Sequence, residues 1–224
     1  MDEHGAPGPD GSAPPAGRKR PVRRAQRRDA AENRERILAA AREAFQTSGP
    51  GVSMEVIARE AGIGPATLYR HFVSKDALVS ELVSAFYDKL LRLAAEAGRH
   101  EPDVALGEFL RTVGWQIATS RGILPRSWGE LARPEQVSKL QEMTAELLAG
   151  AQRSGTVNSQ LTLTDVAMAV WALRGVIETS GSVDPDVWQR HLAVVMAGFR
   201  ADRLDLRRPP LEAPDIARAA AGEV

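Results

Sequence analysis

Apolar side chains recur along most of this chain at intervals of three and four residues, the period of an α-helix that buries one face. The pattern predicts helices over residues 29–46, 74–98, 134–152, 162–180 and 186–201, and a further helix that begins at Pro102. Residues 122–129 predict a broken connection or a short helix. No segment requires the strict alternation of a β-strand, so we predict an all-α fold.

Residues 51–78 contain two short helix patterns joined by a sharp turn. Ser53 is placed to cap the first helix with its hydroxyl, and Glu55 lies in the first turn, where the helix dipole favours negative charge. Gly62 permits the positive φ of a tight turn, and Pro65 takes a first-turn position where its missing N–H costs nothing. The sequence therefore predicts a compact helix-turn-helix.

The second of these helices should cover residues 65–71 or 65–72 and have two different faces. Leu68 and Phe72 are four residues apart and point inward. The opposite, exposed face carries Thr67, Tyr69, Arg70 and His71. A polar face of this kind on a second helix is typical of a DNA-reading unit.

Together with the preceding helix, this unit resembles the DNA-binding domain of the TetR family of bacterial transcriptional regulators, over residues 29–82. At Gly64-Pro65-Ala66 the chain departs from the family pattern, which often has Ser or Thr and then a basic or polar residue. Either Thr67, Arg70 and water-mediated contacts then carry more of the specificity, or fewer base pairs are read directly. The matching residues are Ile57-Ala58, Ala61-Gly62, Thr67-Leu68-Tyr69, His71-Phe72 and Ser74-Lys75.

The resemblance implies that Thr67, Tyr69 and His71 face double-stranded DNA and that Lys75 lies at a phosphate. Hydroxyl, imidazole and ammonium donors suit phosphate oxygens, and Thr67 can also offer its methyl or hydroxyl to a base edge. The alternative for Tyr69 is burial against the first helix. Ser53 is placed either to cap its helix or to reach a phosphate as well, whereas simple capping is the favoured role of Ser74.

Charge is balanced overall, with 29 Lys and Arg against 29 Asp and Glu, but it is unevenly distributed. Residues 18–72 carry twice as many basic as acidic side chains, as a phosphate-binding surface would. Part of the excess is a basic arm over residues 18–28. This arm either follows DNA phosphates or a minor groove, or is a solubilising tail.

The sequence divides into four predicted regions. Residues 1–28 form a disordered, basic N-terminal arm, and residues 29–73 form the helix-turn-helix DNA-binding domain. Residues 74–204 form a helical regulatory and dimerisation domain, and residues 205–224 form a loose C-terminal tail. With no cysteine, no secretion signal and no apolar run long enough to span a bilayer, a cytoplasmic location without membrane attachment is expected.

The last two predicted helices are apolar around more than one narrow stripe, which favours pairing with a second subunit. The resemblance likewise implies a homodimer through a four-helix bundle, and two recognition helices related by a two-fold axis would read a palindromic operator. The alternative is that both helices are central to a monomeric core. The candidate interface residues are Val170, Leu173, Ile177, His191, Val195 and Phe199.

Large apolar residues in the C-terminal half are candidates for the effector pocket found in the family's ligand-binding domains, although ordinary core packing is the commoner role of such residues. Arg174 is a candidate polar group of that pocket, and the alternative is an exposed ion pair with Glu178. The effector class would be a small apolar molecule. The apolar candidates are Phe86, Trp115, Trp128, Met143 and Trp171.

No enzyme motif is complete in the sequence, so no catalytic residue, cofactor or metal is assigned. Gly62-x-Gly64 lacks the third glycine of a dinucleotide fingerprint, and His100 with Asp103 makes a poor metal site. The leading hypothesis is a dimeric repressor that a small molecule releases from its operator. The alternatives are a DNA-binding regulator with no small-molecule effector and, far behind, an all-α enzyme.

Overall fold

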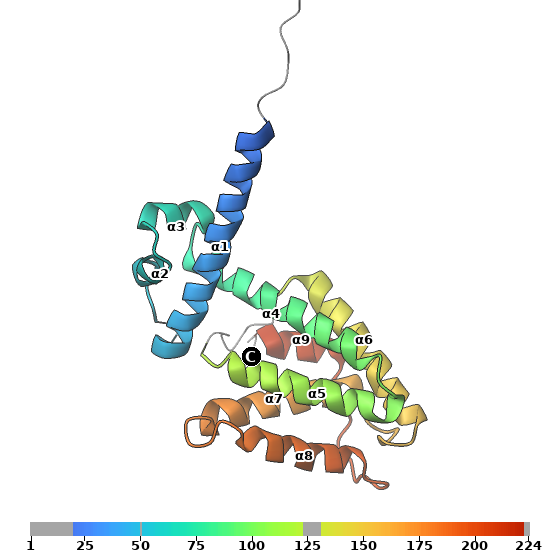
Figure 1. Cartoon of the computed structure of the whole chain (residues 1–224). Coiled ribbons are helices and arrows are strands. Elements are labelled where there is room, and N and C mark those ends of the chain that lie inside the picture. Colours follow the sequence, from blue (N-terminus) through green and yellow to red (C-terminus); the bar gives the residue numbers. More distant parts are fainter. Residues whose placement is uncertain (1–19, 50, 123–130, 222–224) are drawn as a thin grey trace, which may run out of the picture. The chain divides into compact units, whose positions relative to one another are not determined.

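A computed structural model describes residues 20–49, 51–122 and 131–221, and within these ranges every regular element is a helix (Figure 1). The predicted connection at residues 122–129 lies almost entirely outside the described residues. The helices are α1 (Arg20–Ser48), α2 (Met54–Glu60), α3 (Pro65–His71), α4 (Lys75–Ala97), α5 (Pro102–Thr119), α6 (Pro134–Arg153), α7 (Leu163–Ser180), α8 (Val187–Phe199) and α9 (Ala213–Ala221).

The chain divides into two units, residues 1–36 and residues 37–224. In the first unit, α1 begins at Arg20, earlier than the start at residue 29 that the apolar pattern predicts. Helix α1 therefore overlaps residues 20–28 of the predicted N-terminal arm. Pro21 lies in the first turn, where its missing N–H is tolerated, and the Arg and Ala residues that follow are strong helix formers.

Two apolar cores build the second unit. The small core joins the end of α1, α2, α3 and the start of α4, from Ile37 to Leu82. The large core extends from Val83 to Phe199 and includes residues of α4 to α8. Val79 packs against both cores, so α4 is a single helix shared by the small core and the large core.

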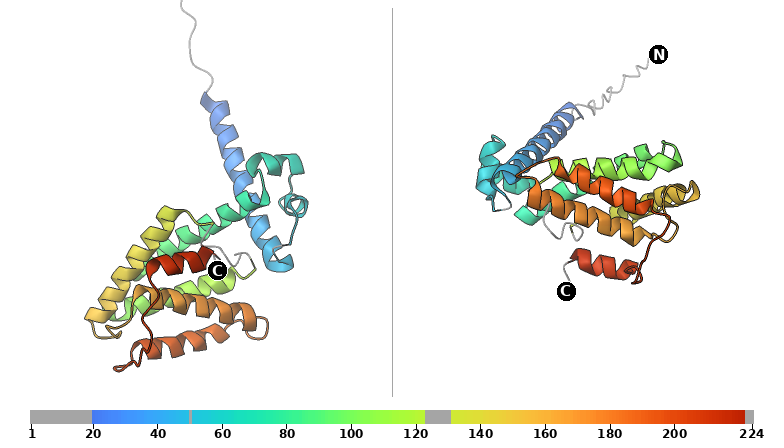
Figure 2. Two further views of the ribbon diagram at one scale, coloured as in Figure 1. Left: turned by 180° about the vertical axis from the view of Figure 1, so that it is seen from behind. Right: turned by 90° about the horizontal axis from the view of Figure 1, so that it is seen from below.

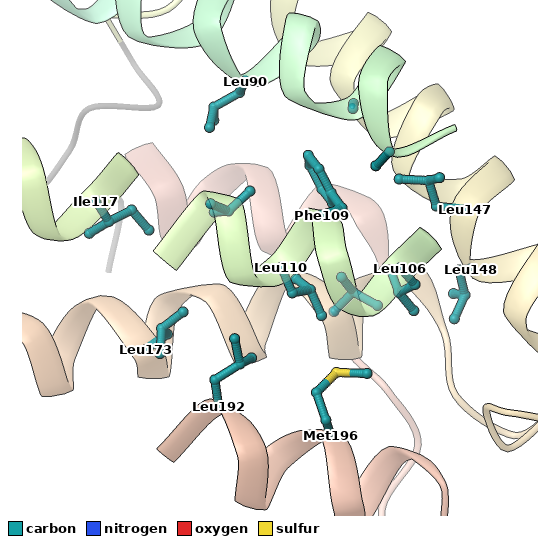
Figure 3. Packing of buried hydrophobic residues seen from close by; sticks show 14 of the residues in the cluster. Leu90, Leu106, Phe109, Leu110, Ile117, Leu147, Leu148, Leu173, Leu192 and Met196 are labelled. Carbon is teal, nitrogen blue, oxygen red and sulfur yellow. The ribbon is translucent and has the colours of Figure 1, made fainter. Parts of the chain in front are cut away.

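In the large core, α5 lies between α4 and α6 on one side and α7 and α8 on the other (Figures 1 and 2). Figure 3 shows Leu173 of α7 and Leu192 and Met196 of α8 directed toward α5, which contributes Leu106 and Leu110. Gly114 of α5 allows the side chain of Trp188 of α8 to lie directly against the α5 backbone. A Cβ there would lie 2.7 Å from Cε3 of the buried Trp188 and nearer still to its Cζ3.

The polar signals at the helix starts are confirmed. The hydroxyl of Ser53 accepts from the backbone N–H of Val56 at 3.4 Å, and that of Ser74 accepts from Ala77 at 3.1 Å. Thr162 and Asp165 form a reciprocal capping box at the start of α7. These bonds satisfy backbone donors that have no partner within the helix.

One buried amide ties α6 to α4. Gln136 Nε2 donates to Asp88 Oδ1 at 2.6 Å and to the carbonyl oxygen of Ser84 at 3.2 Å. The Ser84 hydroxyl donates to Gln136 Oε1 at 3.3 Å, so all the polar atoms of this amide side chain are used. Both Ser84 and Gln136 are buried.

A second contact joins the end of α1 to the end of α5. Gln46 Nε2 donates to the backbone carbonyl of Thr119 at 2.7 Å. Gly122 follows with a φ of +82°, and a Cβ at this position would lie 2.9 Å from the carbonyl oxygen of Phe45. Glycine is therefore favoured here by both its conformation and its neighbour.

The predicted loose tail contains a helix, α9. Glu212 donates its backbone N–H to Asp215 Oδ2 at 3.4 Å, and Ile216 is buried. Pro214 lies in the first turn, where prolines are common. The sequence signal for this helix is Asp215, three positions after Glu212, but the neighbouring prolines favour a loose tail.

Candidate nucleic-acid interface

The turn between α2 and α3 has the predicted geometry. Gly62 has a φ of +66°, and the backbone N–H of Ile63 donates to the carbonyl of Ala58 at 3.0 Å. Leu68 and Phe72 are buried in the small core. These two side chains anchor one face of α3 in the small core, and the opposite face is directed toward solvent.

The outward face of α3 carries the predicted polar residues. Tyr69 is 44% exposed and Arg70 is also exposed, whereas Thr67 and His71 are half-buried. The alternative of Tyr69 buried against the first helix is therefore wrong. Arg70 Nη2 donates to the hydroxyl of Thr67 at 3.0 Å, so the two residues predicted to carry base readout already contact each other.

The start of α3 is exposed and offers no polar side chain. Gly64, Pro65 and Ala66 are all exposed, and Gly64 makes no side-chain capping bond. Any polar base contact from α3 must therefore come from later positions on the helix.

Glu55 links the two helices of this unit. The phenolic O–H of Tyr69 donates to Glu55 Oε1 at 3.3 Å. The pKa of Glu55 is lowered by the backbone N–H and the Ser53 hydroxyl at the start of α2 and by the bond from Tyr69, all of which favour the charged carboxylate. In turn, the negative charge of Glu55 raises the pKa of Tyr69. The sequence predicts only a helix-start role for Glu55, because a contact across fourteen positions depends on how α2 and α3 pack.

Lys75 lies in the first turn of α4, beside the capping Ser74. Its side chain is half-buried, and Nζ is 5.6 Å from the centroid of the Phe45 ring, within the range of a cation–π contact. The ammonium group that is predicted to contact a phosphate therefore lies against Phe45, a residue of the small core.

The candidate pocket residues differ in their burial. Phe86 is buried in the large core, Met143 packs against that core, and Trp171 is half-buried. Trp115 is 57% exposed, because it lies on the opposite side of α5 from the buried Val113, Gly114 and Ile117, so the prediction that it lines a pocket is wrong. Trp128 lies outside the described residues.

Arg174 differs from the expected exposed ion pair. Its side chain is only 10% exposed, and Nε donates to Glu178 Oε1 at 2.5 Å, while Glu178 remains 41% exposed. Burial of a guanidinium requires such a partner, because an unpaired charge is costly to remove from water. Arg174 is thus a buried cation within the helical domain.

Three candidate dimer residues belong to the core of one chain. Leu173, Ile177 and Phe199 are buried in the large core, so they are not available to a second copy, and their assignment to the interface is wrong. Val170, His191 and Val195 are half-buried. The apolar pattern overestimated the interface because α7 and α8 bury one face against α5.

In the described parts of the chain, no helix combines the length and apolar character needed to cross a membrane. No cluster of His, Asp and Glu suited to a metal ion occurs in the same residues.

Two family models match the sequence. The model described as bacterial regulatory proteins of the tetR family matches residues 37–82, the region of the small core. The model described as the C-terminal domain of SbtR-like transcriptional regulators matches residues 101–201, which include α5 to α8. Helix α9 lies beyond both matches.

Individual proteins give the same result. The HTH-type transcriptional regulator UidR of Escherichia coli (strain K12) is 28% identical over 199 residues, covering 86% of this chain and 88% of UidR. A TetR transcription regulatory protein from Mycobacterium vanbaalenii is 30% identical with a TM-score of 0.56, over 79% of this chain and 99% of that one. A TetR transcriptional regulator from Streptomyces coelicolor is 26% identical with a TM-score of 0.55, over 76% and 99%.

Proposed function

This chain belongs to the TetR family of transcriptional regulators, and from that premise we propose that it is a homodimeric repressor whose palindromic operator is released by a small molecule. The observation that carries the DNA-binding part is the outward face of α3, with Thr67, Tyr69 and Arg70, flanked by Ser53 and Lys75. Hydroxyl and cationic donors on one convex unit suit the phosphates and base edges of a major groove. This role requires the compartment that holds the DNA, which in a bacterium is the cytoplasm.

For the dimer, we propose the outward faces of α7 and α8. Small residues there leave room for a second backbone: Ala172 and Gly175 on α7, and Ala197 and Gly198 on α8 are exposed. A Cβ at Gly175 or at Gly198 would meet nothing within 4 Å, and Val194 beside them is 64% exposed. Size-exclusion chromatography at micromolar concentration tests the assignment, and a stable monomer would contradict it.

For the effector, we propose that ligand binding to the helical domain favours a conformation that holds the two recognition helices at the wrong spacing. Arg174 supports this role, because it is a nearly buried cation beside the large apolar core. Selection of bound DNA fragments followed by release screening with small molecules tests the whole proposal. Retention of DNA with no releasing compound would favour the regulator without an effector.

The phosphate role of Lys75 has a direct test. Lys75→Ala should lower the slope of log affinity against log salt by about one, because one released counterion is lost. Lys139→Ala is the matched control, since this exposed lysine lies in α6 and pairs with Glu142. Equal slopes for both variants would remove Lys75 from the interface.

A further inference from the structure

The carboxylate of Glu55 already holds a hydroxyl group that the proposed function gives to DNA. Tyr69 donates its O–H to Glu55 Oε1 at 3.3 Å, and Ser53 caps the start of the helix that carries Glu55. Ser53, Glu55 and Tyr69 are all exposed, so this is a surface arrangement open to an incoming ligand.

The phenol of Tyr69 has one proton to donate, and it gives this proton to Glu55. A DNA phosphate can receive the proton only if the bond to Glu55 is broken. The carboxylate and the phosphate are both anionic oxygen acceptors, so they compete for the same donor.

We propose that Glu55 is a positioning residue that acts as an internal competitor of the DNA backbone: its carboxylate holds the hydroxyl of Tyr69 in the free protein, and this hydroxyl must change partner when phosphate arrives. This inference rests on the proposed DNA contact of Tyr69. Its consequence is that wild-type affinity is lower than the donors of this surface alone would give.

Glu55→Gln tests the competition, because the amide keeps the shape of the side chain but removes its charge. We expect about two- to fivefold tighter binding to a selected operator, the range of an exposed charge pair. Glu60→Gln is the matched control. Glu60 is the exposed last residue of the same helix, and the substitution changes the net charge equally. A gain as large in Glu60→Gln would mean that only overall charge matters and would overturn the proposal.

The role of Tyr69 is tested in a Tyr69→Phe background. If Glu55 acts through the Tyr69 hydroxyl, Glu55→Gln should gain less affinity there than in the wild type. The same gain in both backgrounds would show that Glu55 repels phosphate without holding this donor, which would contradict the proposal.

The contact itself can be measured without DNA. Because Glu55 raises the pKa of Tyr69, Glu55→Gln should lower it, as followed by ultraviolet absorbance of the ionised phenol. The only other tyrosine, Tyr87, is buried with a pKa raised to about 12, and Tyr69→Phe identifies which phase belongs to Tyr69. Far-ultraviolet circular dichroism verifies that each variant remains folded over the titration.

The measurements separate this inference from the proposed function. An unchanged Tyr69 pKa in Glu55→Gln would overturn the contact, whatever the DNA result. A lowered pKa with equal or weaker DNA binding would leave the contact in place and overturn the competition. A wild-type protein that retains no DNA from selection would overturn the proposed function and the competition together, while the titration would still report on the pair.

Discussion

Replacing Gly114 by alanine should destabilise the helical domain, although alanine is the better helix former. The added Cβ would lie 2.7 Å from Cε3 of Trp188 and 3.0 Å from Cδ2 of Leu173, and both neighbours are almost fully buried. Overpacking of this kind costs about 1–3 kcal/mol. The gain in helix propensity offsets about 1 kcal/mol of that.

The matched control is Gly107→Ala in the same helix. A Cβ there would have only Met196 Cε within 4 Å, at 3.7 Å, which is ordinary van der Waals contact. Because helix propensity cancels between the two variants, the difference in their unfolding free energies isolates the overpacking, about 1–3 kcal/mol. Thermal unfolding should place Gly114→Ala below Gly107→Ala by about 2–4 °C for each kcal/mol.

Both melting curves must be recorded at one protein concentration, since self-association makes the midpoint depend on concentration. Trp188→Leu in the Gly114→Ala background should relieve the contact, and the double-mutant cycle should give a coupling of about 1 kcal/mol or more. The packing argument is refuted if Gly114→Ala melts at or above Gly107→Ala.

Thr162→Ala removes the capping box of α7 and should lower the unfolding free energy by about 1 kcal/mol, seen as a lower urea midpoint; an unchanged midpoint would contradict a stabilising cap. Gln136→Leu deprives the buried Ser84 hydroxyl of its acceptor and should destabilise by about 1–3 kcal/mol in the same assay, whereas a neutral effect would mean that Ser84 finds another partner. Gly122→Ala combines a positive φ with a close carbonyl of Phe45, so we expect a loss of about 1–2 kcal/mol or more, and equal stability would argue against this backbone geometry.

The sequence predicted the positions of most helices because their signals are local. The caps at Ser53, Ser74 and Thr162 and the turn at Gly62 depend on residues a few positions apart, and each was confirmed. The sequence does not predict the start of α1 or the presence of α9, because proline and repeated charge disfavour a helix there while the propensity of Ala and Arg favours one.

The site was less predictable where its residues meet across helices. The orientation of Trp115 and the burial of Leu173 depend on which face of α5 and α7 packs inward. An apolar stripe shows that a helix face is buried but not which other helix buries it. Arg174 lies in the interior for the same reason. The Glu55–Tyr69 contact needs the packing angle of α2 on α3, which no spacing along the chain gives.

The junction between α1 and α5 bears on how freely such regulators can exchange parts. A chimaera that takes its DNA-reading helices from one protein and its effector-sensing helices from another must rebuild the bond from Gln46 to the Thr119 carbonyl. It must also supply a residue without a Cβ at position 122, opposite the Phe45 carbonyl. A breakpoint after α3 therefore places Phe45 and Gln46 in one parent protein and Thr119 and Gly122 in the other. The two parents of a chimaera should be matched at these contacts first and at their linkers afterwards.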